Sequence, residues 1–109
     1  MSVSVVIPAY NEDEIIGIIL EQLVQLDEVD EIIVVDDGSS DNTVEVAQTF
    51  ADHNVMVVQH PYNIGNGAAV NTGIRNAKGD IIVMMDADGQ HPPAEIPKML
   101  SYMEQYAMV

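Results

Sequence analysis

The sequence predicts an α/β fold of the Rossmann-like type, in which helices on both faces cover a parallel sheet. Short apolar runs rich in Val and Ile alternate with segments whose apolar residues recur at helical spacing. Each apolar run is followed by a group of Pro, Gly, Asn or Asp residues that is typical of a strand-to-helix turn. Because the runs are apolar on both sides, we expect them to be buried on both sides, in a three-layer α/β/α arrangement.

The strands are expected where β-branched residues cluster, at residues 3–7, 31–35, 55–59 and 81–85. Helices are expected between them, at residues 12–26, 41–53 and 68–78, and after them from Pro92 onward. This β-α-β-α-β-α-β-α order, with right-handed crossovers, predicts the strand order 3-2-1-4 in a single domain of residues 1–109.

The helices are indicated by apolar residues three or four positions apart, which lie on one face of a helix. These residues are Ile15, Ile16, Ile19 and Leu23 in the first helix, Val44, Ala47 and Ala51 in the second, Val70, Gly73, Ile74 and Ala77 in the third, and Ile96, Met99, Leu100 and Met103 in the last. Ser40 or Asp41 is expected to cap the second helix at its N-terminus, and Gly79 the third helix at its C-terminus.

The composition argues against several classes of function. The chain of 109 residues has 18 acidic and 3 basic residues, a formal net charge of −15, which disfavours binding to nucleic acid or to an anionic membrane surface. It has no Cys, which excludes disulfides, thiolate metal sites and thiol nucleophiles. The apolar runs are far shorter than the ~18 residues of a membrane span, and the acidic N-terminal segment is not typical of a signal peptide. We therefore expect a cytoplasmic protein, and the acidic excess also fits a high-salt organism.

Polar side chains gather where the predicted strands end. They are Tyr10, Asn11 and Glu12 after the first strand, Asp36 and Asp37 after the second, Asn63 and Asn66 after the third, and Asp86, Asp88, Gln90 and His91 after the fourth. The carboxyl ends of parallel strands meet at one edge of the sheet, and ligands bind outside that edge, near the point where the strand order reverses. We therefore expect these side chains to surround a ligand.

The four acidic groups at the ends of the second and fourth strands predict a bound cation. Asp86 and Asp88 are two positions apart, so their carboxylates point to the same side if the chain is extended there. Asp36 and Asp37 follow a neighbouring strand, and no Lys or Arg lies among the four. Carboxylates this close repel one another unless their pKa values shift or a cation joins them, and oxygen ligands favour Mg²⁺ or Mn²⁺. Such an ion accepts phosphate oxygens, so a diphosphate substrate would complete the site.

Each of these signals also has a purely structural interpretation. Acidic residues between a strand and a helix are often helix caps, and Asp-Asp-Gly-Ser at 36–39 is a common turn composition. Tyr10 can pack against the protein or cover a nucleobase. His53 and His60 are expected at the surface rather than as ligands. The first turn lacks a G-x-G-x-x-G pattern, and segment 65–67 lacks the Gly-Lys-Ser/Thr ending of a Walker loop, which argues against both kinds of nucleotide site.

Three segments together resemble a known family. VSVVIPAYNEDEII, EIIVVDDGSSDNTVEVA and NIGNGAAVNTGIRNAKGDIIVMMDADGQHPP are similar, in order and spacing, to the inverting glycosyltransferases of family two, and most closely to the dolichol-phosphate mannose synthase type. The resemblance extends from Val3 to about Leu100. It implies the N-terminal half of a glycosyltransferase A-type fold, and transfer of a sugar with inversion from a nucleotide-diphosphate sugar such as a GDP- or UDP-sugar.

The resemblance also implies roles for individual residues. Those that match the segments around the nucleoside, its base and its ribose are Pro8, Ala9, Tyr10, Glu12, Asp36 and Asp37. Those that match the D-x-D segment, which holds the metal ion and the donor diphosphate and sugar, are Asp86, Asp88 and Gln90. Several relatives carry Lys or Arg near positions 66 and 71, where this chain has Asn66 and Asn71. The metal ion is therefore expected to balance more of the negative charge of the donor phosphates.

Members of this family are longer than this chain, and their second half supplies the acceptor site. We therefore expect a donor-binding half whose acceptor is a polyprenyl (lipid) phosphate or a saccharide, in a full-length protein peripheral to the inner face of a membrane. No residue is assigned as a catalytic base. The alternatives are a non-catalytic nucleotide-sugar or metal-binding module and a phosphoacceptor receiver domain, which is disfavoured because no Asp follows the third strand. The outer edge of the fourth strand is expected to pair with a second copy of the chain, giving a homo-oligomer.

Overall fold

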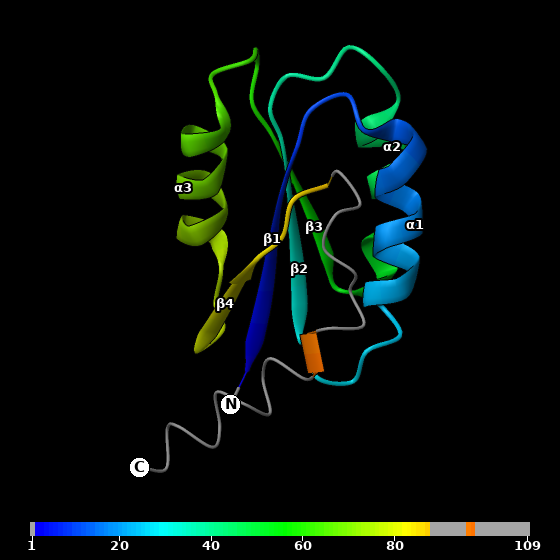
Figure 1. Cartoon of the computed structure of the whole chain (residues 1–109), viewed down its shortest axis with the longest axis vertical. Helices are drawn as coiled ribbons and strands as arrows, with labels where there is room; N and C mark the ends of the chain where they lie inside the picture. Colours follow the sequence, from blue (N-terminus) through cyan, green and yellow to red (C-terminus); the bar gives the residue numbers. More distant parts are fainter. Residues whose placement is uncertain (1, 88–95, 98–109) are drawn as a thin grey trace.

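The computed structural model describes residues 2–87 and 96–97, and its elements follow the predicted alternation of strands and helices (Figure 1). They are β1 (Val3–Ala9), α1 (Asp13–Leu23), β2 (Glu31–Asp36), α2 (Thr43–Gln48), the short 3-10 helix η1 (Ala51–His53), β3 (Val55–Gln59), α3 (Asn66–Asn76) and β4 (Ile81–Met84). The strands in this part of the chain form one parallel sheet in the order β3-β2-β1-β4. The predicted fold class and strand order are therefore confirmed.

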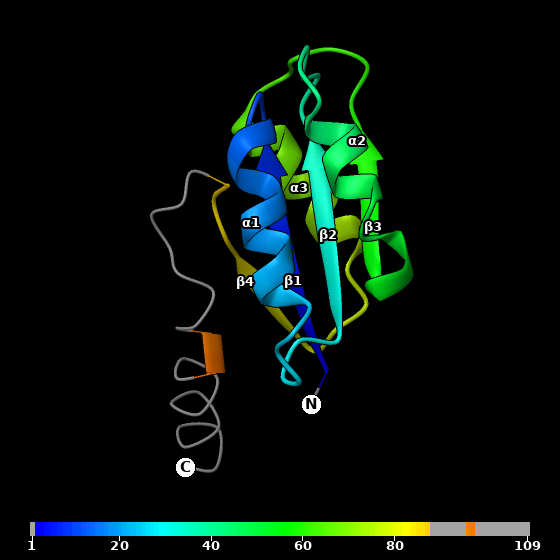
Figure 2. The same cartoon turned by 90° about the vertical axis from the view of Figure 1, so that its right-hand side faces the viewer.

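Helices cover both faces of the sheet, with α3 on one side and α1 and α2 on the other (Figure 1 and Figure 2). β1 is a central strand, and all of its residues are buried. Side chains of a strand point alternately to the two faces. β1 accordingly sends Val5 and Ile7 into the core under α1 and α2, and Val6 into a smaller core under α3. Ile96 is buried in the larger core, whereas the other apolar residues expected of the last helix lie outside the described residues.

The residues predicted to cap α2 do not occupy its N-cap position. That position is Asn42 rather than Ser40 or Asp41, and its side chain makes no capping hydrogen bond. Asp41 acts from one position earlier, because its carboxylate accepts the Thr43 N–H at 3.0 Å. This bond satisfies one of the backbone donors that the first helical turn leaves free, and it fixes Thr43 as the start of the helix.

α1, α2 and α3 all end earlier than predicted, at Leu23, Gln48 and Asn76 rather than at residues 26, 53 and 78. After α2 the Thr49 N–H bonds to the Val46 carbonyl three residues back, and the Thr49 hydroxyl donates to the same carbonyl at 2.6 Å. These contacts tighten the chain toward 3-10 geometry and separate α2 from η1. After α3 the C-cap is Ala77, in an extended conformation, so Gly79 is not the C-cap as predicted. The Gly79 N–H instead donates to the Ser4 hydroxyl at 2.8 Å and joins this turn to the start of β1.

β4 forms the outer edge of the sheet in the part of the chain that the structure describes. On one face of this strand Ile82 and Met84 are 38% and 41% exposed. Pairing of this edge with a second copy of the chain stays a prediction. No helix within the described ranges, 2–87 and 96–97, combines the length and the apolar character that crossing a bilayer requires.

α3 packs closely on the sheet because its buried positions are small. Its buried residues are Ala69 and Gly73, four positions apart on one face. A Cβ atom on Gly73 would overlap the Val6 side chain of β1 and would lie 3.3 Å from Val35 Cγ2 of β2. The helix therefore lies closer to the two central strands than a larger residue at position 73 would allow.

We expect Gly73→Ala to destabilise the fold by about 1–3 kcal/mol, the usual cost of adding a methyl group to a well-packed core. This cost should exceed the gain in helix propensity, which is roughly 1 kcal/mol. The matched control is Gly67→Ala in the same helix, where a Cβ atom would meet nothing within 4 Å. Urea unfolding followed by circular dichroism should show the control unchanged or slightly stabilised. A Gly73→Ala protein as stable as the wild type would contradict the packing argument.

Candidate functional site

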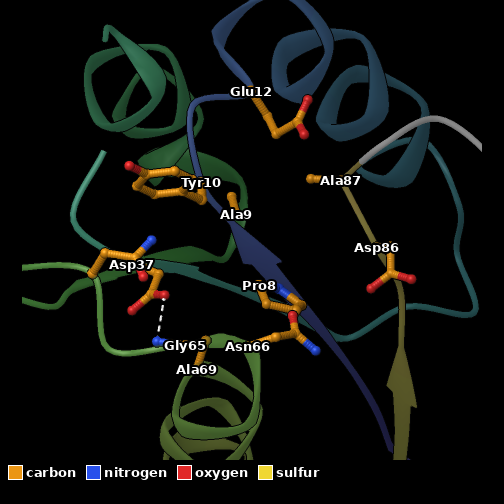
Figure 3. A pocket seen from close by; sticks show the side chains of 11 residues that line it. Pro8, Ala9, Tyr10, Glu12, Asp37, Gly65, Asn66, Ala69, Asp86 and Ala87 are labelled. Carbon is orange, nitrogen blue, oxygen red and sulfur yellow. Dashed lines mark hydrogen bonds between the residues drawn. The ribbon is translucent and has the colours of Figure 1, made fainter. Parts of the chain in front are cut away.

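A pocket of about 340 Å³ lies at the carboxyl ends of β1 and β4, beside the start of α3 (Figure 3). Its lining residues are Pro8, Ala9, Tyr10, Glu12, Asp37, Asn63, Gly65, Asn66, Ala69, Asp86 and Ala87. β1 has β2 on one side and β4 on the other, so the strand order reverses here, which is where open α/β sheets bind ligands. Of the predicted site residues that the structure describes, all except Asn11 and Asp36 line this pocket.

The turn after β1 is held by the turn after β2. Asn11 has a left-handed backbone conformation, with φ of 53°, which Asn tolerates better than most residues. Its N–H donates to the Ser39 hydroxyl at 2.8 Å, and its side-chain oxygen accepts the Ser40 N–H at 2.9 Å. These bonds fix the backbone between Tyr10 and Glu12, whose side chains line the pocket, and Tyr10 remains 47% exposed.

Asp37 is buried in the pocket wall and is bonded through both carboxylate oxygens. Oδ1 lies 2.8 Å from His60 Nδ1 and accepts the Ile64 N–H at 3.0 Å. Oδ2 accepts the Gly65 N–H at 2.9 Å (Figure 3). Burial by itself raises the pKa of this carboxyl, but the hydrogen bonds from His60 and the two backbone N–H groups outweigh it and lower the pKa below its ordinary value of 3.8. Asp37 is therefore an anion at neutral pH.

His60 belongs to this network, and the expectation that it lies at the surface is wrong. Its side chain is 10% exposed, because the ring lies between Asp37 and α3. Nδ1 faces Asp37, and Nε2 lies 2.8 Å from the Thr72 hydroxyl. Sequence analysis missed both His60 and Thr72, although His60 directly follows β3 and so stands at the same edge of the sheet as the predicted site residues. His53 is exposed, as expected.

A close contact between two loops brings Asp37 to its partners. Gly38 follows Asp37 and has a φ of 77°. A Cβ atom on Gly38 would overlap backbone atoms of Tyr62 and Asn63, in the loop between β3 and α3. Glycine is the residue that combines this conformation with this approach at no steric cost. The loop of residues 60–65 can therefore fold over Asp37 and present its N–H groups to the carboxylate.

Asp36 has a different role from its neighbour. It is the last residue of β2, is 2% exposed, and does not line the pocket. Its Oδ2 accepts the Ser39 N–H at 3.0 Å, which stabilises the turn after β2. Its Oδ1 is buried and has no hydrogen-bond partner among the described residues. Because successive residues of a strand point to opposite faces, the structure separates two acidic residues that sequence analysis treated as a pair.

The acidic cluster expected around a cation lies only partly within the described residues. Asp86 follows β4, is exposed, and stands across the pocket from Asp37 (Figure 3). Asp88, Gln90 and His91 lie outside the described residues. Residues 2–87 and 96–97 contain no group of three or more His, Cys, Asp or Glu side chains that could hold a metal ion. The negative charge of Asp37 is balanced by N–H donors.

The charge of the pocket fits a divalent cation that carries a phosphate ligand. Three carboxylates line it, those of Glu12, Asp37 and Asp86, and none of its described lining residues is Lys or Arg. All charged side chains that a diphosphate would meet among these lining residues are negative, so a cation would have to accompany it. The candidate ligands, Asp86 together with Asp88 and Gln90, offer the carboxylate and amide oxygens that Mg²⁺ and Mn²⁺ prefer.

We expect Asp37→Asn to lower the free energy of unfolding at neutral pH by about 1.5–3 kcal/mol, the usual contribution of a hydrogen bond to a charged group. Folding lowers the pKa of Asp37 below 3.8, so the carboxylate stabilises the fold above that pH. Its contribution disappears as the pH falls through the lower pKa of the folded state. Urea unfolding across the acid range should therefore show the two proteins converging below pH 3.8.

The control for this experiment is Asp52→Asn, the same change at an exposed position. It should leave the free energy of unfolding close to the wild-type value at every pH, because surface substitutions away from special contacts change stability by about 0.5 kcal/mol or less. A difference between wild type and Asp37→Asn that does not change with pH would contradict the charge assigned to Asp37.

Comparison with known proteins places this chain among sugar transferases. The sequence model of Glycosyl transferase family 2 matches residues 4–109. The undecaprenyl-phosphate 4-deoxy-4-formamido-L-arabinose transferase of Proteus mirabilis (strain HI4320) is 41% identical over 110 residues, which cover 94% of this chain and 34% of that protein. This chain thus spans about a third of the length of that relative.

Solved structures share the fold. S. aureus TarS 1-349 in complex with UDP-GlcNAc matches with a TM-score of 0.83 and 27% identity, over 96% of this chain and 32% of that one. The mannosyltransferase PcManGT from Pyrobaculum calidifontis, in complex with GDP-Man and Mn²⁺, matches with a TM-score of 0.71 and 34% identity, over 79% of this chain and 27% of that one. Since the family's sequence model matches nearly the whole sequence, this chain belongs to glycosyltransferase family 2.

Proposed function

We propose that this chain is the donor-binding part of an inverting, metal-dependent glycosyltransferase, and that its pocket binds a nucleotide-diphosphate sugar. The observation that carries this proposal is the pocket itself, which gathers residues expected at the nucleoside end and at the diphosphate end of such a donor. The solved structures support the ligand class, since one holds UDP-GlcNAc and another holds GDP-Man with Mn²⁺.

The nucleoside would lie on the side of the pocket where Tyr10 and Asp37 stand (Figure 3). The exposed ring of Tyr10 can stack on a base, which contributes about 1–3 kcal/mol in nucleic-acid-binding proteins. A carboxylate only accepts hydrogen bonds, so Asp37 favours a base that presents an N–H group, as uracil and guanine do. Pro8 and Ala9, at the end of β1, line the pocket between these groups and Asp86.

The diphosphate would lie at the other end of the pocket. Asp86, with Asp88 and Gln90 as further ligands, would hold Mg²⁺ or Mn²⁺, and the bound ion supplies the positive charge that stabilises a departing nucleoside diphosphate. Asn66, at the start of α3, also lines the pocket. Because Asn66 carries no charge, it can donate hydrogen bonds to phosphate oxygens but cannot replace the cation.

The acceptor would be a polyprenyl phosphate, and the full-length protein would act at the inner face of a membrane. This part of the proposal is supported by the relative from Proteus mirabilis, whose name specifies undecaprenyl-phosphate. A phosphate monoester has a second pKa of ~6, so its oxygen is already anionic at neutral pH. Such an oxygen can attack the anomeric carbon, with inversion, without a side-chain base.

We expect binding of UDP-GlcNAc or GDP-Man to this chain to depend on Mn²⁺. Isothermal titration calorimetry should give an affinity at least about tenfold higher with Mn²⁺ than with EDTA, a factor that corresponds to about 1.4 kcal/mol. Asp86→Asn should remove most of this difference, because one oxygen ligand loses its charge. Asp52→Asn, the same change in the exposed η1, should leave the difference intact. Tight binding that ignores the metal, or full Mn²⁺ dependence in Asp86→Asn, would defeat the proposal.

We expect Tyr10→Ala to weaken nucleotide-sugar binding by about one to two orders of magnitude, as the loss of base stacking does elsewhere. Tyr10→Phe keeps the ring and should bind nearly as well as the wild type. Calorimetric titration of both variants with the same donor in Mn²⁺ measures the difference. If Tyr10→Phe binds as poorly as Tyr10→Ala, the hydroxyl rather than the ring is responsible, and the stacking role is wrong.

A further inference from the structure

His60 connects the pocket wall to α3 through its two ring nitrogens. Nδ1 lies 2.8 Å from Asp37 Oδ1, and Nε2 lies 2.8 Å from the Thr72 hydroxyl. A carboxylate only accepts hydrogen bonds, so Nδ1 carries a hydrogen and donates it to Asp37. In the neutral ring Nε2 then accepts the hydrogen of the Thr72 hydroxyl. Both ring nitrogens are therefore used, one toward the pocket and one toward the helix.

His60 is the side-chain partner of Asp37, and it is anchored in two elements of the fold. Of the other two donors, Ile64 lies in the loop before α3 and is 50% exposed, and Gly65 is the N-cap residue of α3. His60 directly follows β3, and its backbone N–H donates to the carbonyl of residue 36 at 2.8 Å. The bond to Thr72 adds α3 as a second support. A side chain held from two elements fixes the group that it contacts more firmly than a loop does.

We propose that His60 is a positioning residue for nucleobase recognition, an inference that rests on the proposed function. The donors described above occupy Asp37 Oδ1 twice and Oδ2 once. A carboxylate oxygen can accept about two hydrogen bonds, so Oδ2 keeps capacity for one more, and Asp37 lines the pocket. Held in place by His60, this oxygen accepts the N3–H of uracil or the N1–H of guanine. Cytosine and adenine present an accepting ring nitrogen at the corresponding position, so two acceptors would face each other.

Two substitutions test the contacts of the two ring nitrogens of His60 separately. In His60→Asn the amide nitrogen stands near the place of Nδ1, so it can donate to Asp37 but cannot reach Thr72. In His60→Gln the amide stands near the place of Nε2, so it can reach Thr72 but leaves Asp37 without this donor. The readouts are two ratios of dissociation constants, CDP to UDP and ADP to GDP, measured by calorimetry with the 109-residue chain and Mn²⁺.

We expect His60→Gln to lower the larger of the two wild-type ratios about tenfold, the effect of misplacing one hydrogen bond to a charged group. His60→Asn should keep most of that ratio, and His53→Gln, at an exposed position, should keep all of it. A purely structural role would weaken the binding of all four nucleotides alike. An unchanged ratio in His60→Gln would therefore overturn the inference, and so would a His60→Asn ratio as low as that of His60→Gln.

Thr72→Val provides a second variant in case His60→Gln does not fold. It removes the hydroxyl that holds Nε2 and should lower the same ratio about threefold, as expected for a hydrogen bond between neutral groups. An unchanged ratio in Thr72→Val would also overturn the inference.

Failure of the proposed function would look different from failure of this inference. A wild-type chain that binds none of the four nucleotides in Mn²⁺ would overturn the proposed function and the inference together. A wild-type chain that binds them, but without discrimination between bases, would overturn the inference and the base preference assigned to Asp37, and would leave the proposed binding of a nucleotide-diphosphate sugar standing.

Discussion

The buried carboxylate of Asp37 is the interaction on which the pocket depends. A charge removed from water is costly unless other donors replace the water, and here a histidine ring and two backbone N–H groups do so. All three donors come from residues 60–65, between β3 and α3, so the anion that needs them also fixes the course of that loop. Because Asp37, Asn63 and Gly65 line the pocket, the bonds that stabilise the loop are also the bonds that shape the site.

The two ends of the pocket differ in how their charge is balanced. At Asp37 the protein supplies N–H donors, so this end can face an uncharged, hydrogen-bonding group such as a nucleobase. Asp86 at the other end is exposed, and none of the described lining residues offers it a Lys or Arg partner. That end suits a cation with its phosphate ligands. Under the proposed function, the charge pattern would orient a bound donor with its base toward β2 and α3 and its diphosphate toward β4.

The sequence predicted the strands to within two residues at each end, because runs of Val and Ile depend only on burial of both faces. It also predicted the polar side chains that line the pocket within the described residues, since these follow the ends of parallel strands, although Asn11 and Asp36 were expected there and do not line it. The separation of Asp36 from Asp37 follows from the alternation of side chains along a strand, so the same reasoning could have predicted it. The burial of His60 could not be predicted in this way, because it depends on the contact of Gly38 with a distant loop and on Thr72, twelve residues away. The ends of α2 likewise depend on individual side-chain hydrogen bonds, which produce no periodic pattern of residues in the sequence.

The packing of α3 connects the core to the nucleobase end of the site. Gly73 lets α3 lie close to Val6 of β1, and the preceding residue, Thr72, reaches His60 at 2.8 Å. A hydrogen bond of this length weakens steeply when its atoms move apart. An outward shift of the helix would therefore loosen two supports of Asp37, the bond of His60 to Thr72 and the N–H donor of Gly65, the N-cap residue of α3. Asp86 follows β4, on the opposite side of β1 from β2, whereas Asn66, which also lines the pocket, stands at the start of α3. A small residue in the core thus helps to set the geometry of the pocket wall that carries Asp37.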